Sequence, residues 1–516
     1  MTAWLVPGVA LVGALIEACA VPCAFAAPRL PRPFVSGGIA LLVALVFLML
    51  SARPWSSAIA ALALMTAVVA VSNAKFRAIR EPLVFVDFAM LGQILRHPHI
   101  FITLVGVLAA LVATAALATA ITAAILLEAP LPALSPSGAR LAGLLAALLA
   151  VAAIVRLGHG RLVRWGWAVE PSLDARADVA RFGLFGSLLL TTLLATDGTK
   201  AAEIDRSGAP PAAGPQPANR PNIVAVQLES FFDVRLMDPR FDRGLLPCFD
   251  AYAGSAALHG RLDVPAWGYT QRSEFAFLSG LADQDLGVDR YNPYARLARR
   301  PVWTIAHELR RQGYRTICIH PFHGTFFGRD RVVANLGFDR FLDIADFDGA
   351  ARFGPYVSDR AVADKAIALL DEPGPPLFIF IITIESHGSF RNNRLPPQEL
   401  ERVRNDALGL SPAFFSYLRH LGNADRMIGQ LAGHFERSGE GVLCVYGDHL
   451  PSFPAVFRKL RFRDGRTDYL IWRPGHDGPA LVKDMHIRSL SRSLLDVAWS
   501  PRRPARRPVG AEGLSS

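Results

Sequence analysis

The N-terminal part of the chain constrains the fold most, because it consists of a series of long apolar stretches. These stretches run over residues 4–26, 34–51, 55–73, 100–127 and 138–155. Each is close to the about 20 apolar residues that a helix needs to cross a bilayer core. A shorter stretch at 182–196 is a sixth candidate, although its length also suits an interfacial or buried helix. We therefore expect a polytopic α-helical membrane domain over residues 1–197, with five or six transmembrane helices.

The loops between these stretches differ in charge. The basic residues on one set of alternate loops are Arg29, Arg32, Lys75, Arg77, Arg80, Arg96, Arg156, Arg161, Arg164, Arg176 and Arg181, and those on the other set are Arg53 and Arg140. Basic loops are retained on the cytoplasmic side of a membrane. Six spans then place everything after Thr196 on the outer face, whereas five spans either break this rule or leave the C-terminal part in the cytoplasm. We favour six spans.

The composition agrees with a membrane part and excludes two other classes. Hydrophobic residues make up 52% of the 516 residues and charged residues only 19%, which is too apolar for a wholly soluble protein. The formal charge of +10 does not predict a nucleic-acid partner, because many of the basic residues lie in the loops between the apolar stretches. The five cysteines show neither CxxC spacing nor an even set in the C-terminal part, so we expect buried free thiols rather than disulfides or a zinc cluster.

A Pro-, Ala- and Gly-rich linker over 198–221 separates the membrane part from a globular domain over 222–500. Apolar runs typical of strands are Asn222–Leu228, Arg315–Ile319, Leu377–Ile384 and Val442–Val445, and helical runs are Val302–Gln312, Asp359–Leu370 and Ala413–Arg437. Strands that are apolar on both faces belong in a parallel sheet covered by helices. The basic tail at 501–516 has the composition of a disordered segment.

Polar side chains of the metal-ligand type follow each of these four strands. The clusters are Gln227-Leu228-Glu229-Ser230, His320, Glu385-Ser386-His387 and Asp448-His449. Open α/β sheets bind ligands outside the carboxyl ends of their strands, and a divalent cation accepts mixed carboxylate and imidazole ligands. Strand ends that simply meet polar loops would explain one or two of these clusters. Four of them predict a site at this edge of the sheet.

Thr270 is the candidate nucleophile. It stands in the segment Trp267-Gly-Tyr-Thr-Gln-Arg-Ser-Glu-Phe275, where a turn runs into a helix. Backbone N–H groups at a helix N-terminus favour an anion, and a threonine hydroxyl needs a metal or a base to become nucleophilic. The alternative for Thr270 is a helix N-cap, with Ser273 and Glu274 as ordinary capping residues.

Five short motifs occur in a specific order in the C-terminal half of the chain. They are Asn-Ile-Val-x-x-Gln-Leu-Glu-Ser-Phe at 222–231, Thr-x-x-Ser-Glu-Phe at 270–275, Phe-Phe-Gly-Arg-Asp at 326–330, Glu-Ser-His-Gly at 385–388 and Tyr-Gly-Asp-His at 446–449. This set resembles the lipoteichoic acid synthase and phosphoglycerol transferase family of the alkaline phosphatase/sulfatase superfamily. The resemblance implies an α/β sulfatase-like domain, with a mostly parallel sheet covered by helices, after the membrane domain.

The resemblance also implies roles for individual residues. Glu229, Thr270, Asp448 and His449 would bind one divalent metal, typically Mn²⁺, with Zn²⁺ or Mg²⁺ as alternatives, and Thr270 would also be the nucleophile. The residues that would hold the substrate are Arg329, His387, His320 and Phe327. Phe327 stands where the family has a tryptophan.

The activity implied is transfer of glycerol phosphate from a phosphatidylglycerol-like lipid to a surface or periplasmic glycan or polymer, at the outer face of a bacterial inner membrane. A phosphoethanolamine transferase of the same superfamily is an alternative, although its enzymes carry several disulfides in the soluble domain. A sulfatase needs a cysteine in a Cys-x-Pro-x-Arg setting, and none of the five cysteines has that setting. A non-catalytic membrane scaffold is the alternative from another class.

Overall fold

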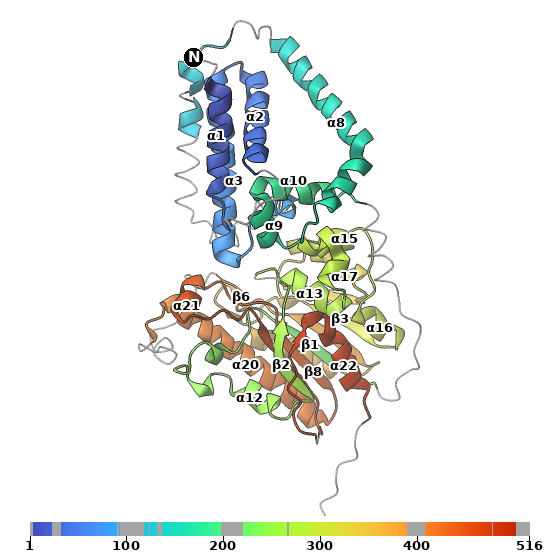
Figure 1. Cartoon of the computed structure of the whole chain (residues 1–516). Coiled ribbons are helices and arrows are strands. Elements are labelled where there is room, and N and C mark those ends of the chain that lie inside the picture. Colours follow the sequence, from blue (N-terminus) through green and yellow to red (C-terminus); the bar gives the residue numbers. More distant parts are fainter. Residues whose placement is uncertain are drawn as a thin grey trace, which may run out of the picture. The chain divides into compact units, whose positions relative to one another are not determined.

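The chain forms two compact units, Met1–Ala201 and Ala202–Ser516, which Figure 1 shows in a computed structural model. The residues described are 4–22, 32–89, 92, 118–122, 124–131, 137–197, 220–265, 268–388, 390, 408–476 and 478–501. The predicted linker and the predicted basic tail lie almost entirely outside these residues. The domain boundaries proposed from the sequence therefore stay predictions.

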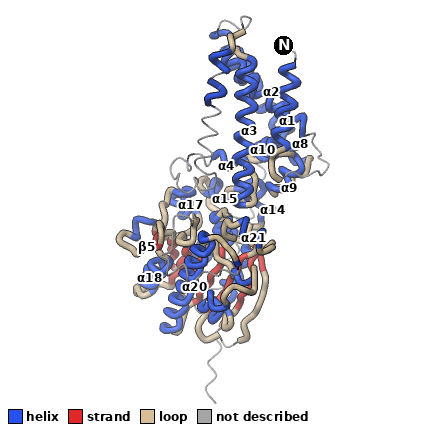
Figure 2. Tube along the Cα trace, turned by 90° about the vertical axis from the view of Figure 1, so that its left-hand side faces the viewer, coloured by secondary structure: helices blue, strands red, loops and turns tan. Residues whose placement is uncertain are grey.

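Helices α1 (Leu5–Ala18), α2 (Arg32–Ser51) and α3 (Pro54–Ile79) lie side by side in the first unit (Figures 1 and 2). Small residues allow the close approach of α1 and α2, because a Cβ added at Gly13 would lie 2.6 Å from the Cβ of Ala40. Small residues are enriched between membrane helices for this reason. Further helices of this unit are α4 (Phe85–Ala89), α8 (Ser137–Ala168), α9 (Ala175–Phe182) and α10 (Leu184–Leu194).

Within the described residues, three helices are long and apolar enough to cross a membrane: α2, α3 and the Leu141–Ala168 part of α8. These helices indicate a membrane protein, as the composition predicts. Within the described part of the stretch predicted at 4–26, residues 4–22, the α-helix runs over Leu5–Ala18, and the stretch at 100–127 lies mostly outside the described residues. The stretch at 182–196 contains α10, whose 11 residues fall short of the about 20 that a span needs. The number of spans stays a prediction.

The second unit is built on an eight-stranded sheet with the strand order β10-β2-β9-β8-β1-β7-β3-β4. The strands are β1 (Ile223–Leu228), β2 (Leu258–Asp263), β3 (Arg315–Ile319), β4 (Arg340–Leu342), β7 (Leu377–Ile382), β8 (Val442–Gly447), β9 (Thr467–Trp472) and β10 (Met485–His486). Strand β9 alone runs antiparallel to its neighbours in this sheet. Strands β5 (Arg352–Phe353) and β6 (Tyr356–Val357) form a separate hairpin.

Helices cover both faces of the sheet, and Figure 2 shows its red strands enclosed by blue helices. On β1, Val224 and Val226 pack in the core under α18 and α20, whereas Ile223 and Ala225 pack in the core under α13, α16 and α22. The helices of this unit are α12 (Pro247–Ala253), α13 (Thr270–Ser279), α14 (Asp283–Leu286), α15 (Pro293–Leu297), α16 (Ile305–Arg311), α17 (Arg329–Asn335), α18 (Asp359–Leu370), α20 (Pro412–Ser438), α21 (Pro454–Lys459) and α22 (Leu490–Trp499). The predicted fold class is confirmed.

The central strands are fully buried, as the sequence predicts for parallel strands with two covered faces. Two of the cysteines, Cys318 on β3 and Cys444 on β8, are buried free thiols, and Cys19 and Cys248 are also free. The expected buried free thiols are therefore confirmed at Cys318 and Cys444, whereas Cys19 is exposed and Cys248 is only partly buried. Cys23 lies outside the described residues.

Candidate active site

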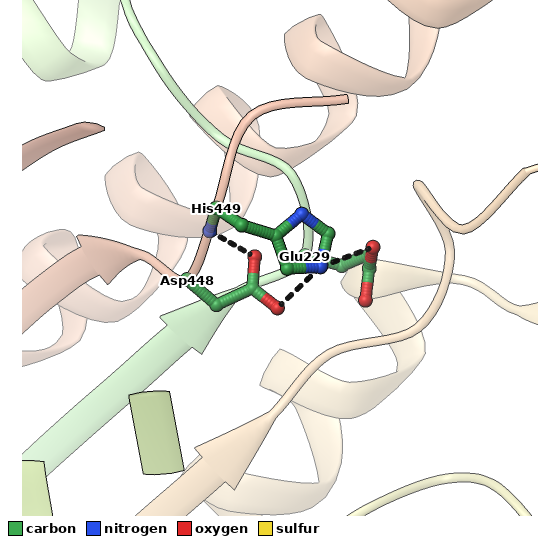
Figure 3. Close-up of side chains that lie close together, drawn as sticks. All are labelled: Glu229, Asp448 and His449. Atoms are coloured by element: carbon green, nitrogen blue, oxygen red, sulfur yellow. Dashed lines mark hydrogen bonds and ion pairs between the residues drawn. The ribbon is translucent and has the colours of Figure 1, made fainter. Parts of the chain in front are cut away.

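The carboxyl ends of β1 and β8 bring Glu229, Asp448 and His449 together. Strands β1 and β8 are parallel neighbours, with Leu228 paired to Gly447, so the residues that follow them emerge side by side. The three side chains are almost fully buried, and one ligand atom of each lies within 4.8 Å of the others. Figure 3 shows them pointing toward one another. We call these residues the ligand triad.

Gly447 makes this close approach possible. A Cβ at Gly447 would lie 1.8 Å from the carbonyl oxygen of Phe231, in the segment that follows β1. No side chain fits in that space. The glycine of the Tyr-Gly-Asp-His motif therefore allows the two loops that carry the ligand triad to touch.

Ser230 connects the members of the ligand triad to one another. Its backbone N–H donates to Asp448 Oδ1 at 2.8 Å, and its hydroxyl donates to Glu229 Oε1 at 2.8 Å. This arrangement requires a left-handed backbone at Ser230, with φ of 56°, which costs about 1 kcal/mol or more for a non-glycine residue. The hydroxyl of Tyr417 on α20 donates to the Ser230 carbonyl at 2.7 Å and holds this conformation.

The protonation of His449 follows from its hydrogen bond. Its Nδ1 lies 3.1 Å from the Leu450 carbonyl, which can only accept, so Nδ1 carries the proton in the neutral ring. The lone pair of Nε2 then faces Asp448 Oδ2 at 3.3 Å and Glu229 Oε1 at 3.6 Å. Three electron-rich atoms converge with no hydrogen between them. Such a site needs a cation or a proton at its centre.

The electrostatics of the ligand triad agree with that need. Burial raises the pKa of Asp448 to about 7, with His449 lowering it and Glu229 raising it further. Burial opposes ionisation of His449, yet the Asp448 and Glu229 carboxylates raise its pKa. Asp448 Oδ1 accepts hydrogen bonds from the backbone N–H groups of Ser230 and His449, whereas the buried Oδ2 has no partner of normal hydrogen-bond geometry. Two carboxylates and an imidazole nitrogen match the ligands of divalent Mn, Zn or Mg, so these residues fit a divalent metal.

Thr270 lies beside the ligand triad and is only partly buried. It is the first residue of α13, and the N-cap is Tyr269, so the N-cap interpretation of Thr270 is wrong. A hydrogen bond with the Thr270 side chain lowers the pKa of Asp448. The Gln227 amide donates to the Thr270 carbonyl at 3.3 Å, and Ser273 Oγ donates to the Asp448 carbonyl at 2.7 Å. These bonds fasten the start of α13 to the ends of β1 and β8.

A second group of buried residues surrounds Arg329, which begins α17. Its guanidinium donates to both carboxylate oxygens of Glu274 and, at 3.3 Å, to His320 Nε2. The Tyr294 hydroxyl also donates to Glu274. All four side chains are at most 3% exposed. We call Arg329, Glu274, Tyr294 and His320 the arginine cluster. The capping role considered for Glu274 is wrong, because this residue lies in the middle of α13 and pairs with Arg329.

His387 and Tyr356 form a third group of site residues. Tyr356 has its hydroxyl 3.4 Å from His387 Nδ1, and burial together with the Glu229 charge raises its pKa to about 12. His387 Nδ1 lies 2.7 Å from the Gly388 carbonyl, so this nitrogen is a donor and Nε2 holds the lone pair of the neutral ring. His387 also acts electrostatically on His320. The Phe327 ring lies against Arg329, with 5.3 Å between its centroid and the guanidinium carbon.

The roles of several site residues were not predicted from the sequence. Glu385 follows β7, as predicted, but it accepts from His420 Nδ1 and the Asn423 amide on α20, which makes it an anchor for that helix. The contacts of Ser230, Tyr356 and Tyr294 were not predicted, although Ser230 stands in the polar cluster that follows the first strand. Glu274 had one, because it is four residues after Thr270 and so lies on the same helix face.

Comparisons with known proteins agree with this fold. Residues 221–498 match the family model described as sulfatase. The capsular polysaccharide biosynthesis protein RkpI of Rhizobium meliloti (strain 1021) is 30% identical over 451 residues, which cover 82% of this chain and 78% of RkpI.

Two solved structures are similar at lower identity. The lipoteichoic acid synthase LtaP of Listeria monocytogenes is 19% identical, with a TM-score of 0.47, and the match covers 59% of this chain and 79% of LtaP. The phosphoglycerol transferase GacH of Streptococcus pyogenes, solved with sn-glycerol-1-phosphate, is 20% identical, with a TM-score of 0.44, and the match covers 59% of this chain and 80% of GacH. The ligand triad and the arginine cluster both fall inside the residues that match the family model.

Proposed function

The chain belongs to the sulfatase family of the alkaline phosphatase superfamily, and from this premise we propose that it is a membrane-bound phosphoglycerol transferase. It moves glycerol phosphate from a phosphatidylglycerol-like lipid to a cell-envelope glycan or polymer. The observation that carries the proposal is the position of the Thr270 hydroxyl at the start of α13, beside the buried ligand triad. A hydroxyl at a cation site is the arrangement that phosphoryl transfer through a covalent intermediate needs.

The residues that would hold the metal are Glu229, Asp448, His449 and Thr270. A bound divalent cation favours deprotonation of a hydroxyl and offsets charge on phosphoryl oxygens. The proposal takes Mn²⁺ as the metal, while Zn²⁺ and Mg²⁺ suit the same ligands. Restoring activity to chelator-treated protein with each of these ions in turn identifies the one used.

The reaction proceeds in two displacements. Thr270 Oγ1 attacks the phosphorus of the donor, its bond to the diacylglycerol oxygen breaks, and that oxygen leaves with a proton. Glycerol phosphate is then esterified to Thr270. A hydroxyl of the acceptor attacks the same phosphorus, forms the new ester and gives its proton up, while Thr270 recovers its own.

Two further side chains serve these steps. His387 lies beside Tyr356 and within electrostatic range of His320, and its Nε2 lone pair can move protons between the leaving oxygen and the acceptor hydroxyl. Arg329 makes three hydrogen bonds inside the arginine cluster and has five N–H groups. The remaining two N–H groups of Arg329 donate hydrogen bonds to the phosphoryl oxygens of the substrate. His320 supports Arg329 instead of contacting the substrate, because both of its ring nitrogens are engaged.

The relative RkpI supports a glycan acceptor, because its name assigns it to capsular polysaccharide biosynthesis. A catalytic domain on the outer face of the inner membrane would meet both the lipid donor and such an acceptor. Protease digestion of spheroplasts tests the orientation: cleavage of the second unit only after lysis would contradict it.

The donor is tested by incubating membranes with head-group-labelled phosphatidylglycerol. We expect label in a glycan or polymer fraction, and no label there for Thr270→Ala. The matched control is Ser279→Ala, which removes a hydroxyl at the other end of the same helix and should retain transfer. Transfer from labelled phosphatidylethanolamine instead would establish the phosphoethanolamine alternative, and release of free glycerol phosphate alone would indicate hydrolysis.

A further inference from the structure

Arg329 is buried, yet its charge is already balanced inside the protein. Its Nε and Nη2 groups donate to the two oxygens of Glu274, and Arg329 is 1% exposed while Glu274 is fully buried. A guanidinium paired with a carboxylate in this bidentate way has a fixed orientation and no net charge. Any ligand that reaches Arg329 therefore meets directed N–H groups rather than a free positive charge.

The other members of the arginine cluster hold that pair in one arrangement. His320 Nδ1 lies 3.0 Å from the Ile382 carbonyl, which can only accept, so Nδ1 carries the proton and Nε2 accepts from Arg329 Nη1. Burial, together with the Arg329 charge, lowers the pKa of His320 well below its usual value, so the ring stays neutral. The Tyr294 hydroxyl donates to Glu274. Arg329 is left with one N–H on Nη1 and one on Nη2.

Glu274 also ties this pair to the nucleophile. It lies four residues after Thr270 on α13, one turn further along the same face. Ser273, between them, binds the Asp448 carbonyl at 2.7 Å. The remaining N–H groups of Arg329 and the Thr270 hydroxyl are thus positioned by one helix.

We propose that Glu274 is a positioning residue that makes the site selective for phosphodiester monoanions over phosphomonoester dianions. The proposal rests on the proposed function, which makes Arg329 a phosphoryl-binding residue. A diester carries one negative charge, whereas a monoester carries close to two above pH 7, because its second pKa is about 6. With Glu274 in place, the second charge of a monoester finds no compensating charge at Arg329. An uncompensated charge in a buried site is costly.

A purely structural role of the Arg329–Glu274 pair would give a different result when Glu274 is replaced. If Glu274 only stabilises the fold, its replacement changes stability but leaves the preference between ligands of different charge unaltered. If Glu274 neutralises Arg329 at the site, its isosteric replacement by Gln leaves a net positive charge and favours the dianion. The relative affinity for two ligands of similar size and different charge separates these cases.

The experiment uses the full chain in detergent, loaded with Mn²⁺, at pH 8. Isothermal titration compares dimethyl phosphate, a monoanion, with methyl phosphate, a dianion. We expect the wild type to bind dimethyl phosphate at least as tightly as methyl phosphate. Glu274→Gln should shift the affinity ratio toward methyl phosphate by at least about tenfold, as expected for an added unit charge at contact distance. It should also lower kcat/KM for the labelled donor.

Two more variants complete the test. Asp425→Asn is the matched control, because Asp425 is a buried carboxylate that caps α12 through the N–H groups of Cys248 and Phe249, and it should leave the ratio unchanged. Tyr294→Phe keeps the charge of Glu274 but removes a hydroxyl that donates to it, so the carboxylate is less screened and the ratio should shift in the opposite direction, toward dimethyl phosphate, by a smaller factor, about threefold.

The outcomes are decisive in each case. A folded Glu274→Gln protein with the wild-type ratio overturns the inference. If that variant does not fold, an unchanged ratio in Tyr294→Phe, or tighter binding of methyl phosphate by the wild type itself, overturns it. Wild-type protein that shows the expected ratio but transfers no labelled glycerol phosphate contradicts the proposed donor and leaves the selectivity of the site established.

Discussion

The ligand triad and the arginine cluster are both buried groups of charged side chains, but they differ in how completely their polar atoms are paired. In the arginine cluster, each guanidinium nitrogen of Arg329 and each carboxylate oxygen of Glu274 has at least one hydrogen-bond partner. In the ligand triad, the buried Asp448 Oδ2 has no partner of normal hydrogen-bond geometry, and the His449 Nε2 lone pair faces two carboxylate oxygens. A buried acceptor without a donor costs about 1–3 kcal/mol. On the proposed function, the ligand triad would need an added cation or a proton, whereas the arginine cluster is organised in advance.

Asp448→Asn should have the largest effect of the changes that test this comparison. The amide has a similar shape but lacks the charge that a divalent cation needs. We expect a loss of at least about a hundredfold in transfer activity, since metal chemistry supplies several kcal/mol to such reactions, together with loss of bound metal in elemental analysis. Full metal content in the variant would show that the ligand triad is not the metal site.

Ser230→Ala should have a smaller effect. The variant loses the hydroxyl that donates to Glu229 at 2.8 Å but keeps the backbone N–H that donates to Asp448. Residues that orient metal ligands are worth about 10–100-fold in metal affinity, so we expect a decrease of about tenfold in a competitive chelator titration. Ser279→Ala is the control. Equal metal affinities for the two variants would contradict the role given to Ser230.

Without a divalent cation, the stability of the folded protein should fall as pH rises. Burial raises the folded pKa of Asp448 to about 7, above its unfolded value of about 3.9. The native state therefore holds this proton more tightly, and the associated stability is present near pH 4 and lost as pH rises to about 7. The raised pKa of His449 acts in the same direction.

Thermal unfolding of chelator-treated protein at pH 5.5 and pH 8 measures this loss. We expect a lower Tm at pH 8, by an amount that corresponds to about 1–3 kcal/mol, and recovery on adding Mn²⁺. Asp448→Asn should show a smaller pH dependence. Greater stability at pH 8 than at pH 5.5 without metal would contradict the charge balance described for the ligand triad.

Hydrogen exchange should show the smallest change, and it tests the comparison directly. Adding Mn²⁺ to metal-free protein should slow exchange in the segments that follow β1 and β8, which carry the ligand triad. The start of α17, where Arg329 lies, should change little because its partners are already in place. Equal slowing in both regions would show that the arginine cluster also depends on the cation.

Sequence patterns located the parts of the fold that have strong periodicity. Strand Arg315–Ile319 and helix Asp359–Leu370 were predicted with their observed bounds, because one is a near-continuous apolar run and the other is amphipathic. Strand β2 was not predicted, because its sequence Leu-His-Gly-Arg-Leu-Asp is mostly polar and its place in the sheet comes from pairing with β9. Pairing partners that are distant in the chain outweigh local propensity in such strands.

The residues of the candidate site also include some that local sequence patterns predict and others that depend on contacts distant in the chain. Glu229, Asp448 and His449 were predictable, because polar residues after parallel strands converge at one edge of the sheet. The pairing of Glu274 with Arg329 joins residues that are 55 positions apart, and the Tyr417 bond to Ser230 spans 187 positions. No local pattern records such contacts. The partner of a buried charge is known only once the helices are placed around the sheet.

The most direct test of the central claim is whether Thr270 becomes covalently modified during the reaction. Purified protein loaded with Mn²⁺ is incubated with phosphatidylglycerol in the absence of an acceptor, quenched in acid and digested for mass spectrometry. We predict glycerol phosphate attached to Thr270, and removal of that group when the acceptor is added before quenching. Turnover of the lipid with Thr270 unmodified, or modification of another residue in its place, would contradict the account.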